Sequence, residues 1–210
     1  MDSTMQDFPL TVTGILRHGT GLHSSRKVIT ATAEGYRETN YGEFGTRVAQ
    51  LAHGLRGLGV KPGQRVATFM WNNQEHLEAY FAAPCMGAVL HTLNIRLTAE
   101  QLTFIANQAE DSVVLVDMSL APLLAPMLPA MTSVHTVVAV GAGDLGPLEE
   151  SGRNVVRYDD LIDGQPVSYD WPDLDEKSAA AMCYTSGTTG NPKGVVYSHR
   201  SSYLHSMAVC

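Results

Sequence analysis

The chain has 210 residues, of which 44% are hydrophobic and 17% are charged, and this composition is ordinary for a globular protein that buries a core. Its formal net charge of -7 argues against a nucleic acid partner, because phosphate contacts need clustered lysine and arginine. The longest apolar tracts, residues 81–90 and 120–131, are too short to cross a bilayer, and the acidic N-terminus does not have the pattern of a signal peptide.

The N-terminal part of the chain predicts a hairpin followed by a helix. Residues 1–25 include a weakly amphipathic stretch that ends in Gly19 and Gly21, and residues 27–32 and 36–40 then have the pattern of two strands joined by a turn. Asn40 is followed three residues later by Glu43, which is the pattern of a capping box at a helix start. Apolar residues continue at helical spacing until a further pair of glycines ends the helix.

The rest of the chain predicts short apolar strands with helices between them. These strands are expected at residues 65–70, 88–91, 112–116, 135–140 and 179–183. The helix after the first of them should end or kink near Pro84, and Thr98 with Gln101 forms a second capping-box pattern. Residues 141–173 are polar with scattered glycine and proline, and we expect surface connection there. The alternation predicts an α/β fold with a mostly parallel sheet and helices on both faces.

One loop carries the clearest chemical signal. Residues 184–195 read Y-T-S-G-T-T-G-N-P-K-G-V, between a buried apolar strand and a short return strand, so the loop is expected at the tip of a hairpin. Glycines, hydroxyls and one lysine, Lys193, are what a loop needs to surround a polyphosphate with N–H and O–H donors. It is not a Walker A loop, because Lys193 follows a proline and precedes a glycine. The plain alternative is a surface linker, but linkers rarely place one lysine behind a proline between apolar strands.

These residues resemble the phosphate-binding loop of the adenylate-forming superfamily of acyl-CoA synthetases, luciferases and peptide-synthetase adenylation domains. The run at residues 70–97, which begins M-W-N-N-Q-E-H-L, and the run V-V-Y-S-H-R at 195–200 are most similar to the fatty acyl-CoA ligase branch. The resemblance covers the chain from about Tyr36 onward. It implies that residues 1–210 are the N-terminal portion of the large AMP-binding domain, in the N-terminal part of the adenylate-forming fold.

The resemblance also implies a two-step reaction and its cofactors. A carboxylate attacks the α-phosphorus of ATP to give an acyl-adenylate and pyrophosphate, and the thiol of coenzyme A then displaces AMP. The protein would be a fatty acyl-CoA ligase that uses ATP, Mg²⁺ and coenzyme A. Lys193 would assist catalysis by neutralising phosphate charge, and Thr185 would also help hold Mg²⁺. The nucleotide-binding residues implied are Thr185, Ser186, Gly187, Thr188, Thr189, Gly190 and Lys193.

Family members are considerably longer, and their later motifs for adenine, ribose, the second magnesium ligand, the hinge and a C-terminal lysine are missing from this sequence. We therefore expect an N-terminal fragment that is inactive alone and exposes apolar surface, so that self-association or a homodimer is expected. Three widely spaced cysteines favour a reducing, cytoplasmic location over a disulfide framework. Two alternatives stay open: an aryl- or short-chain acyl-CoA ligase, and a non-catalytic short protein that binds a nucleotide or a partner.

Several other patterns resemble sites but favour plainer interpretations. G-A-G-D-L-G at residues 141–146 matches the dinucleotide fingerprint, but a following Ser-Gly pair cuts short the helix that it needs, so a surface turn is expected. His199 and His205 cannot share a helix face, and we expect His199 at a strand-to-helix junction near the nucleotide. Arg96 is expected on the surface, with no chemical role. The adjacent acids are expected to be solvated loop charges at residues 110–111, 149–150, 159–160 and 175–176.

Overall fold

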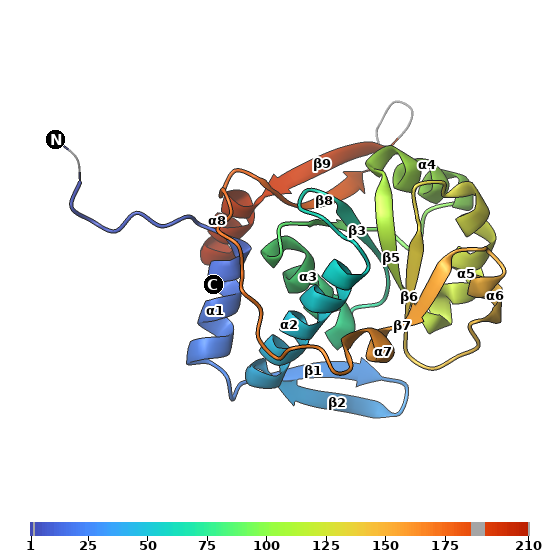
Figure 1. Ribbon diagram of the computed structural model, residues 1–210, viewed down its shortest axis with the longest axis horizontal. Helices are drawn as coiled ribbons and strands as arrows, with labels where there is room; N and C mark the ends of the chain where they lie inside the picture. The colour runs from blue at the N-terminus through green and yellow to red at the C-terminus, as the bar shows by residue number, and fades with distance from the viewer. Residues whose placement is uncertain (2, 186–191, 210) are drawn as a thin grey trace.

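A seven-stranded sheet forms the centre of the molecule, with the strand order β7-β6-β5-β3-β4-β8-β9 (Figure 1). The computed structural model describes residues 1, 3–185 and 192–209 of the chain. The strands of this sheet are β3 (Arg65–Phe69), β4 (Val89–Thr92), β5 (Asp111–Asp117), β6 (Thr136–Val140), β7 (Asn154–Arg157), β8 (Ala179–Thr185) and β9 (Lys193–Ser198). Neighbouring strands run parallel from β7 to β8, and β9 then pairs antiparallel with β8. The mostly parallel sheet predicted from the sequence is confirmed.

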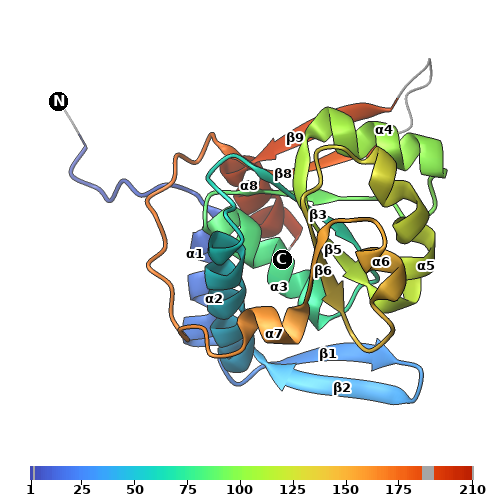
Figure 2. The same cartoon turned by 45° about the vertical axis from the view of Figure 1, so that its right-hand side comes forward.

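Helices cover both faces of the sheet (Figure 2), as the alternation predicted. The first face carries α1 (Val12–Leu22), α2 (Tyr41–Gly57), α3 (Gln74–Cys85) and α7 (Tyr158–Ile162). The second face carries α4 (Ala99–Ala109), η1 (Met118–Leu120), α5 (Ala121–Leu124), η2 (Ala125–Ala130) and α6 (Gly146–Glu149). In β3, Val66 packs into the apolar cluster on the first face and Ala67 into the cluster on the second. Because successive strand residues point to opposite faces and both faces are covered, the inner strands of this sheet consist mostly of apolar residues.

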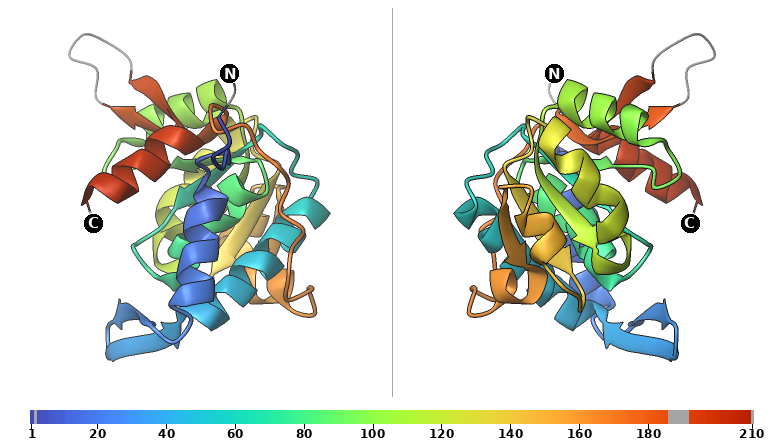
Figure 3. Two further views of the ribbon diagram at one scale, coloured as in Figure 1. Left: turned by 90° about the vertical axis from the view of Figure 1, so that its left-hand side faces the viewer. Right: turned by 90° about the vertical axis from the view of Figure 1, so that its right-hand side faces the viewer.

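Two elements lie outside this layered core. The strands β1 (Lys27–Thr32) and β2 (Gly35–Asn40) form the antiparallel hairpin that the sequence predicted, and they contact α2 and α3. The helix α8 (His199–Val209) follows β9 and lies beside α1 (Figure 3, left). Among the helices of the described residues, none combines the length and the apolar character that a membrane crossing requires.

Side-chain caps start two helices where the sequence predicted them. The Asn40 side chain accepts a hydrogen bond from the Glu43 amide at 2.9 Å, at the start of α2. The Glu43 carboxylate accepts from the Thr39 hydroxyl at 2.6 Å and does not return to the cap amide, so only half of that capping box forms. At the start of α4, Thr98 and Gln101 form both halves of the capping box. Helix α3 ends one residue after its proline, as predicted.

Two parts of the chain are more regular than the sequence predicted. Helix α1 continues through Gly19 and Gly21, because Val12 and Leu16 are buried and their packing offsets a glycine penalty of about 1 kcal/mol per residue. Residues 141–173 are not only connection, since they contain β7 and α7. β7 is a half-buried edge strand, and its backbone pairing with β6 stabilises it without a strong apolar pattern.

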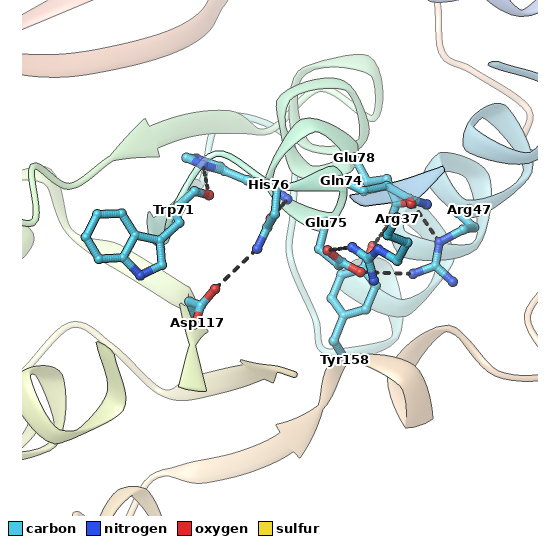
Figure 4. A network of polar contacts seen from close by, with 10 residues as sticks. Arg37, Arg47, Trp71, Gln74, Glu75, His76, Glu78, Asp117 and Tyr158 are labelled. Carbon is cyan, nitrogen blue, oxygen red and sulfur yellow. Dashed lines mark hydrogen bonds and ion pairs between the residues drawn. The ribbon is translucent and has the colours of Figure 1, made fainter. Parts of the chain in front are cut away.

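A network of buried charges joins α2, α3 and α7 (Figure 4). The carboxylate of Glu78, which has 0% exposure, accepts hydrogen bonds from Arg47 Nε at 2.7 Å, from Gln74 Nε2 at 2.8 Å and from the Tyr158 hydroxyl. Burial raises the pKa of Glu78, and the bond from Arg47 opposes that rise. A buried carboxylate is tolerated only when it is paired, so these contacts connect the three helices on one face of the sheet.

The pairing of Glu78 generates a stability prediction. Glu78→Ala should lower the free energy of unfolding by about 3 to 5 kcal/mol, because it removes the buried partner of the half-buried Arg47 and leaves the buried Tyr158 hydroxyl and Gln74 amide without their acceptor. Urea denaturation of the purified chain followed by circular dichroism measures the change. The control is Glu149→Ala, which removes an exposed carboxylate and should change stability by no more than about 0.5 kcal/mol. Equal effects of the two substitutions would contradict the importance of the network.

Candidate functional site

The strands β8 and β9, which flank the predicted phosphate loop in the sequence, form an antiparallel hairpin (Figure 3). The last pair in the register of these strands is Thr185 and Lys193, preceded by the pair Tyr184 and Gly194. We call these four residues the hairpin base. The hairpin predicted from the apolar runs on either side of the loop is therefore confirmed. The predicted nucleotide-binding residues Ser186, Gly187, Thr188, Thr189 and Gly190 lie outside the described residues.

The strand that leads into the loop is less buried than predicted. The sequence of β8 indicated a buried strand, but Ala180 is its one fully buried residue and the next four are half-buried. The reason is its position near the edge of the sheet, where β9 is its outer neighbour and is itself largely exposed.

Lys193 and Thr185 lie side by side at the outer end of the sheet. Both residues are exposed, and they face each other across the two strands. Lys193 forms no ion pair with an acidic side chain of the described residues. An exposed ammonium group beside a hydroxyl can therefore bind an anion, and phosphate oxygens are suitable acceptors for both.

The glycine of the hairpin base is required by the ring of Tyr184. A Cβ atom on Gly194 would lie 3.0 Å from Cζ of Tyr184 and 3.3 Å from Cε of Met182. The Tyr184 ring also lies near His91, whose ring centroid is 5.3 Å away, and it packs against the apolar cluster on the second face of the sheet. Partial burial raises the pKa of Tyr184, and the nearby Asp111 carboxylate adds to that rise. The Tyr184 ring thus lies between the imidazole and the glycine backbone.

The expectation that the paired acids are solvated is wrong for Asp111. This residue has 0% exposure, and its two carboxylate oxygens lie 2.8 and 2.9 Å from Nδ1 of His91. It starts the central strand β5, and the sequence shows no sign of its partner, which lies on β4 twenty residues earlier. Burial raises the pKa of Asp111, and the hydrogen bond with His91 opposes that rise.

The remaining acids of these pairs lie mostly at the surface. The carboxylate of Glu110 is exposed and forms an ion pair with Arg65 at 2.7 Å. Glu176 is partly buried and accepts hydrogen bonds from the Leu10 amide at 2.8 Å and from Arg200 at 2.6 Å. The other members are exposed, as predicted: Glu149, Glu150, Asp159, Asp160 and Asp175.

His199 lies at a strand-to-helix junction, as predicted. It is the first residue of α8, it has 0% exposure, and its Nδ1 accepts a hydrogen bond from the Val12 amide at 3.3 Å. Burial lowers the pKa of His199, which favours the neutral ring that this bond requires. His205 is exposed on α8 and does not join it. The described residues contain no group of three or more His, Cys, Asp or Glu side chains placed to hold a metal.

An apolar groove of about 820 Å³ lies beside the hairpin and was not predicted from the sequence. Its walls come from α1, α3, β4, β8, β9 and α8, and include Ile15, Tyr80, Phe81, Met182 and Cys183. Its polar residues are concentrated on α8, where Ser202, Ser206 and His205 line one side. Sequence reasoning missed this groove because it is formed by six elements, several of which are distant from one another along the chain. A volume of this size accommodates a small organic molecule.

A second cavity of about 690 Å³ lies at the carboxyl ends of β3, β5 and β6. Figure 4 shows several of the side chains that line it, among them Trp71, Glu75 and Asp117. Its charged lining includes Arg37 and Arg47, whose guanidinium groups already pair with Glu75 and Glu78. Asp117 at the end of β5 accepts from the Asn73 side chain at 3.3 Å, which joins the two sides of the cavity. Because its cations are matched by buried acids, this cavity is a poorer phosphate site than the hairpin.

The glycine-rich run at residues 141–146 is a surface turn, as predicted. Gly141 has a φ of +90°, which favours glycine, and the helix that follows has only four residues. The Arg157 side chain donates a hydrogen bond to the Gly143 carbonyl at 2.9 Å and so occupies the turn. Arg96 is exposed, also as predicted.

Comparisons with known proteins match nearly the whole chain. Residues 22–210 match the family described as AMP-binding enzyme. The chain is 40% identical over 203 residues to a 3-methylmercaptopropionyl-CoA ligase of Ruegeria pomeroyi, covering 94% of this chain and 37% of the relative. It is also 40% identical over 210 residues to a long-chain-fatty-acid–CoA ligase of Thermus thermophilus, covering 98% of this chain and 36% of the relative. The chain thus spans little more than a third of the length of these relatives.

The fold is shared with solved structures. An anthranilate CoA ligase in complex with anthranoyl-AMP superposes with a TM-score of 0.81 at 22% identity, over 95% of this chain and 37% of that chain. At that identity the likeness concerns the fold. The predicted N-terminal part of an adenylate-forming fold is therefore confirmed.

The close approach of Tyr184 to Gly194 generates a prediction. Gly194→Ala should lower the free energy of unfolding by about 1 kcal/mol or more, because the added methyl group overpacks against a ring with His91 behind it. Gly21→Ala is the matched control. Its Cβ would meet nothing within 4 Å in helix α1, so the same substitution should stabilise the chain by about 0.5 to 1 kcal/mol. Urea denaturation of both variants measures whether the free energy of unfolding falls or rises in each. A Gly194→Ala chain as stable as the unsubstituted one would refute the argument.

Proposed function

The chain belongs to the AMP-binding enzyme family, and from that starting point we propose that it forms the phosphate-binding part of a fatty acyl-CoA ligase. Such an enzyme joins a fatty acid to coenzyme A through an acyl-adenylate, with ATP converted to AMP and pyrophosphate. The observation that carries the proposal is the hairpin base, where an exposed lysine and an exposed threonine lie opposite each other with no acidic partner for the lysine among the described residues.

In this proposal Lys193 assists the first step electrostatically. Negative charge moves onto the β- and γ-phosphates as pyrophosphate leaves, and an ammonium group positioned beside them stabilises that charge. The strand pairing fixes where the lysine backbone lies before ATP binds, which reduces the reorganisation needed during the reaction. The glycines and hydroxyls at residues 186–190 would donate the remaining hydrogen bonds to the nucleotide.

The hydroxyl of Thr185 suits Mg²⁺, which prefers oxygen ligands and keeps several waters when it binds a nucleotide. The described residues offer no cluster of acids for a metal, so an ion here would take most of its ligands from the phosphates and from water. When bound, the ion would neutralise part of the phosphate charge. The contribution of this chain would be to hold Thr185 at the end of β8, opposite Lys193.

The apolar groove beside the hairpin is where the proposal places the acyl group. Its apolar walls reach Met182 and Cys183 in β8, close to the strand that leads into the loop. The polar side chains of α8 along one wall would contact water or the polar end of the substrate. Relatives that are named for 3-methylmercaptopropionate and for long-chain fatty acids are both 40% identical, so the length of the acid is not assigned.

Two other functions remain as alternatives. An aryl- or short-chain acyl-CoA ligase would use the same hairpin with a differently shaped acid. A chain that binds a nucleotide or a partner without turnover is the second. We propose that residues 1–210 alone do not complete the reaction. A homodimer and a cytoplasmic location stay part of the proposal.

The role of Lys193 can be tested by ATP–pyrophosphate exchange in the ligase that contains this segment. Lys193→Ala should slow the exchange by about 10² to 10³-fold, because one positioned donor to developing charge is lost. The stability of the fold should not change, since the side chain is exposed. Lys61→Ala removes an exposed lysine from a distant turn and should leave the exchange rate unaltered. If the Lys193 variant exchanged at the normal rate, Lys193 would have no part in the reaction. If none of the carboxylic acids in a panel supported exchange by the unsubstituted ligase, the proposed function would be wrong.

A further inference from the structure

A buried histidine–aspartate pair lies directly behind the hairpin base. Nδ1 of His91 is within hydrogen-bond distance of both carboxylate oxygens of Asp111, and both side chains have 0% exposure. The two residues come from β4 and β5, which are the neighbours of β3 on its two sides. Ala67 is the register partner of His91 on β3, and its small side chain leaves room for the pair to meet across that strand.

The pair fixes the orientation of the imidazole. A buried carboxylate needs a donor, so Nδ1–H of His91 donates to Asp111. Nε2 of His91 is buried and has no hydrogen-bond partner among the described residues. The contact with Asp111 is therefore the one hydrogen bond that the described residues give this imidazole. The ring cannot rotate without breaking its bonds to Asp111.

The imidazole in turn limits where the Tyr184 ring can lie. The two rings are 5.3 Å apart between centroids at 44°, and the far side of the tyrosine ring is closed by Gly194. Tyr184 and Gly194 are register partners in the hairpin, and the next pair outward is Thr185 with Lys193. A continuous set of contacts therefore runs from Asp111 in the sheet interior to the two residues proposed to bind phosphate and metal.

We propose that His91 and Asp111 are positioning residues for the phosphate-binding hairpin, acting through Tyr184. Because both side chains have 0% exposure, they would act without contacting the nucleotide. Together they hold the tyrosine ring so that β8 and β9 leave the sheet in one direction, which places Lys193 and Thr185 before ATP binds. This inference rests on the proposed function for its effect on the reaction, but the mechanical link is a property of the fold.

The mechanical link is tested by amide hydrogen exchange on the 210-residue chain. The double variant His91→Leu with Asp111→Leu removes the ring contact and leaves no buried charge unpaired. It should speed exchange at residues 182–184 and 194–197 at least tenfold, with no comparable change in β5 and β6. Tyr184→Leu should reproduce that pattern, whereas Tyr184→Phe keeps the ring and should preserve the protection. Unchanged protection at the hairpin in the double variant would overturn the proposal.

A matched control separates positioning from general loss of stability. His76 is also a buried histidine, with its Nε2 2.9 Å from the Thr68 hydroxyl, but it contacts α3 and β3 rather than the hairpin. His76→Leu should not speed amide exchange at the hairpin more than it speeds exchange in the rest of the sheet. If His76→Leu loosened the hairpin as much as the double variant does, the effect would be global and the proposal would be wrong.

The consequence for the reaction is measured in the ligase that contains this segment. The double variant should reduce kcat for ATP–pyrophosphate exchange about 10²-fold, since a displacement of about 1 Å in a positioned group has an effect of that size. The KM for the fatty acid should stay within about twofold. Hairpin loosening with normal exchange kinetics would overturn the positioning role. Absence of exchange in the unsubstituted ligase would instead refute the proposed function, and the hydrogen-exchange result would still decide the mechanical link.

Discussion

Burial of both faces of one parallel sheet is the constraint on which the rest of this structure depends. Val66 and Ala67 are successive residues of β3, yet they pack into apolar clusters on opposite sides of the sheet. Each inner strand is therefore mostly apolar, and each face needs helices to cover it. Helices α2 and α3 on one side and α4 on the other meet this need. The hairpin of β8 and β9 lies at the edge of this core, where helices do not fully cover the strands and polar side chains can be exposed to solvent.

Because the core is buried, a charged residue is tolerated there only when it has a hydrogen-bonding or ion-pair partner. Glu78 pairs with Arg47 and Tyr158, and Asp111 pairs with His91. In both cases burial raises the pKa of the acid while its partner opposes the rise. Such pairs contribute less to net stability than apolar packing does, but removing one member is costly, and their fixed geometry orients the groups around them. Around Glu78 those groups are helices, and around Asp111 they are the rings behind the hairpin base.

The candidate site combines a polar and an apolar part that meet at β8. Residues at the outer end of that strand and of β9 offer an ammonium group and a hydroxyl, whereas the middle of β8 lines the apolar groove with α1, α3 and α8. One strand therefore lies next to both the proposed phosphate site and the proposed site of the acyl chain. A reaction that joins a carboxylate to a nucleotide needs a polar and an apolar environment close together, which is why we propose this edge of the sheet for it.

The sequence by itself determined the local features of this protein. The alternation of strands and helices, the caps at Asn40 and Thr98, and the hairpin around residues 184–195 all depend on short-range periodicity and hydrogen bonding, which a single stretch of chain expresses. The tertiary structure alone decided the environment of Asp111, the walls of the groove and the pairing of β7. These depend on strand order, which places β4 and β5 on either side of β3 and brings His91 to a carboxylate twenty residues away. Whether a charged residue is buried, and which residue pairs with it, is decided by the assembled sheet. The residues next to it in the sequence do not decide either.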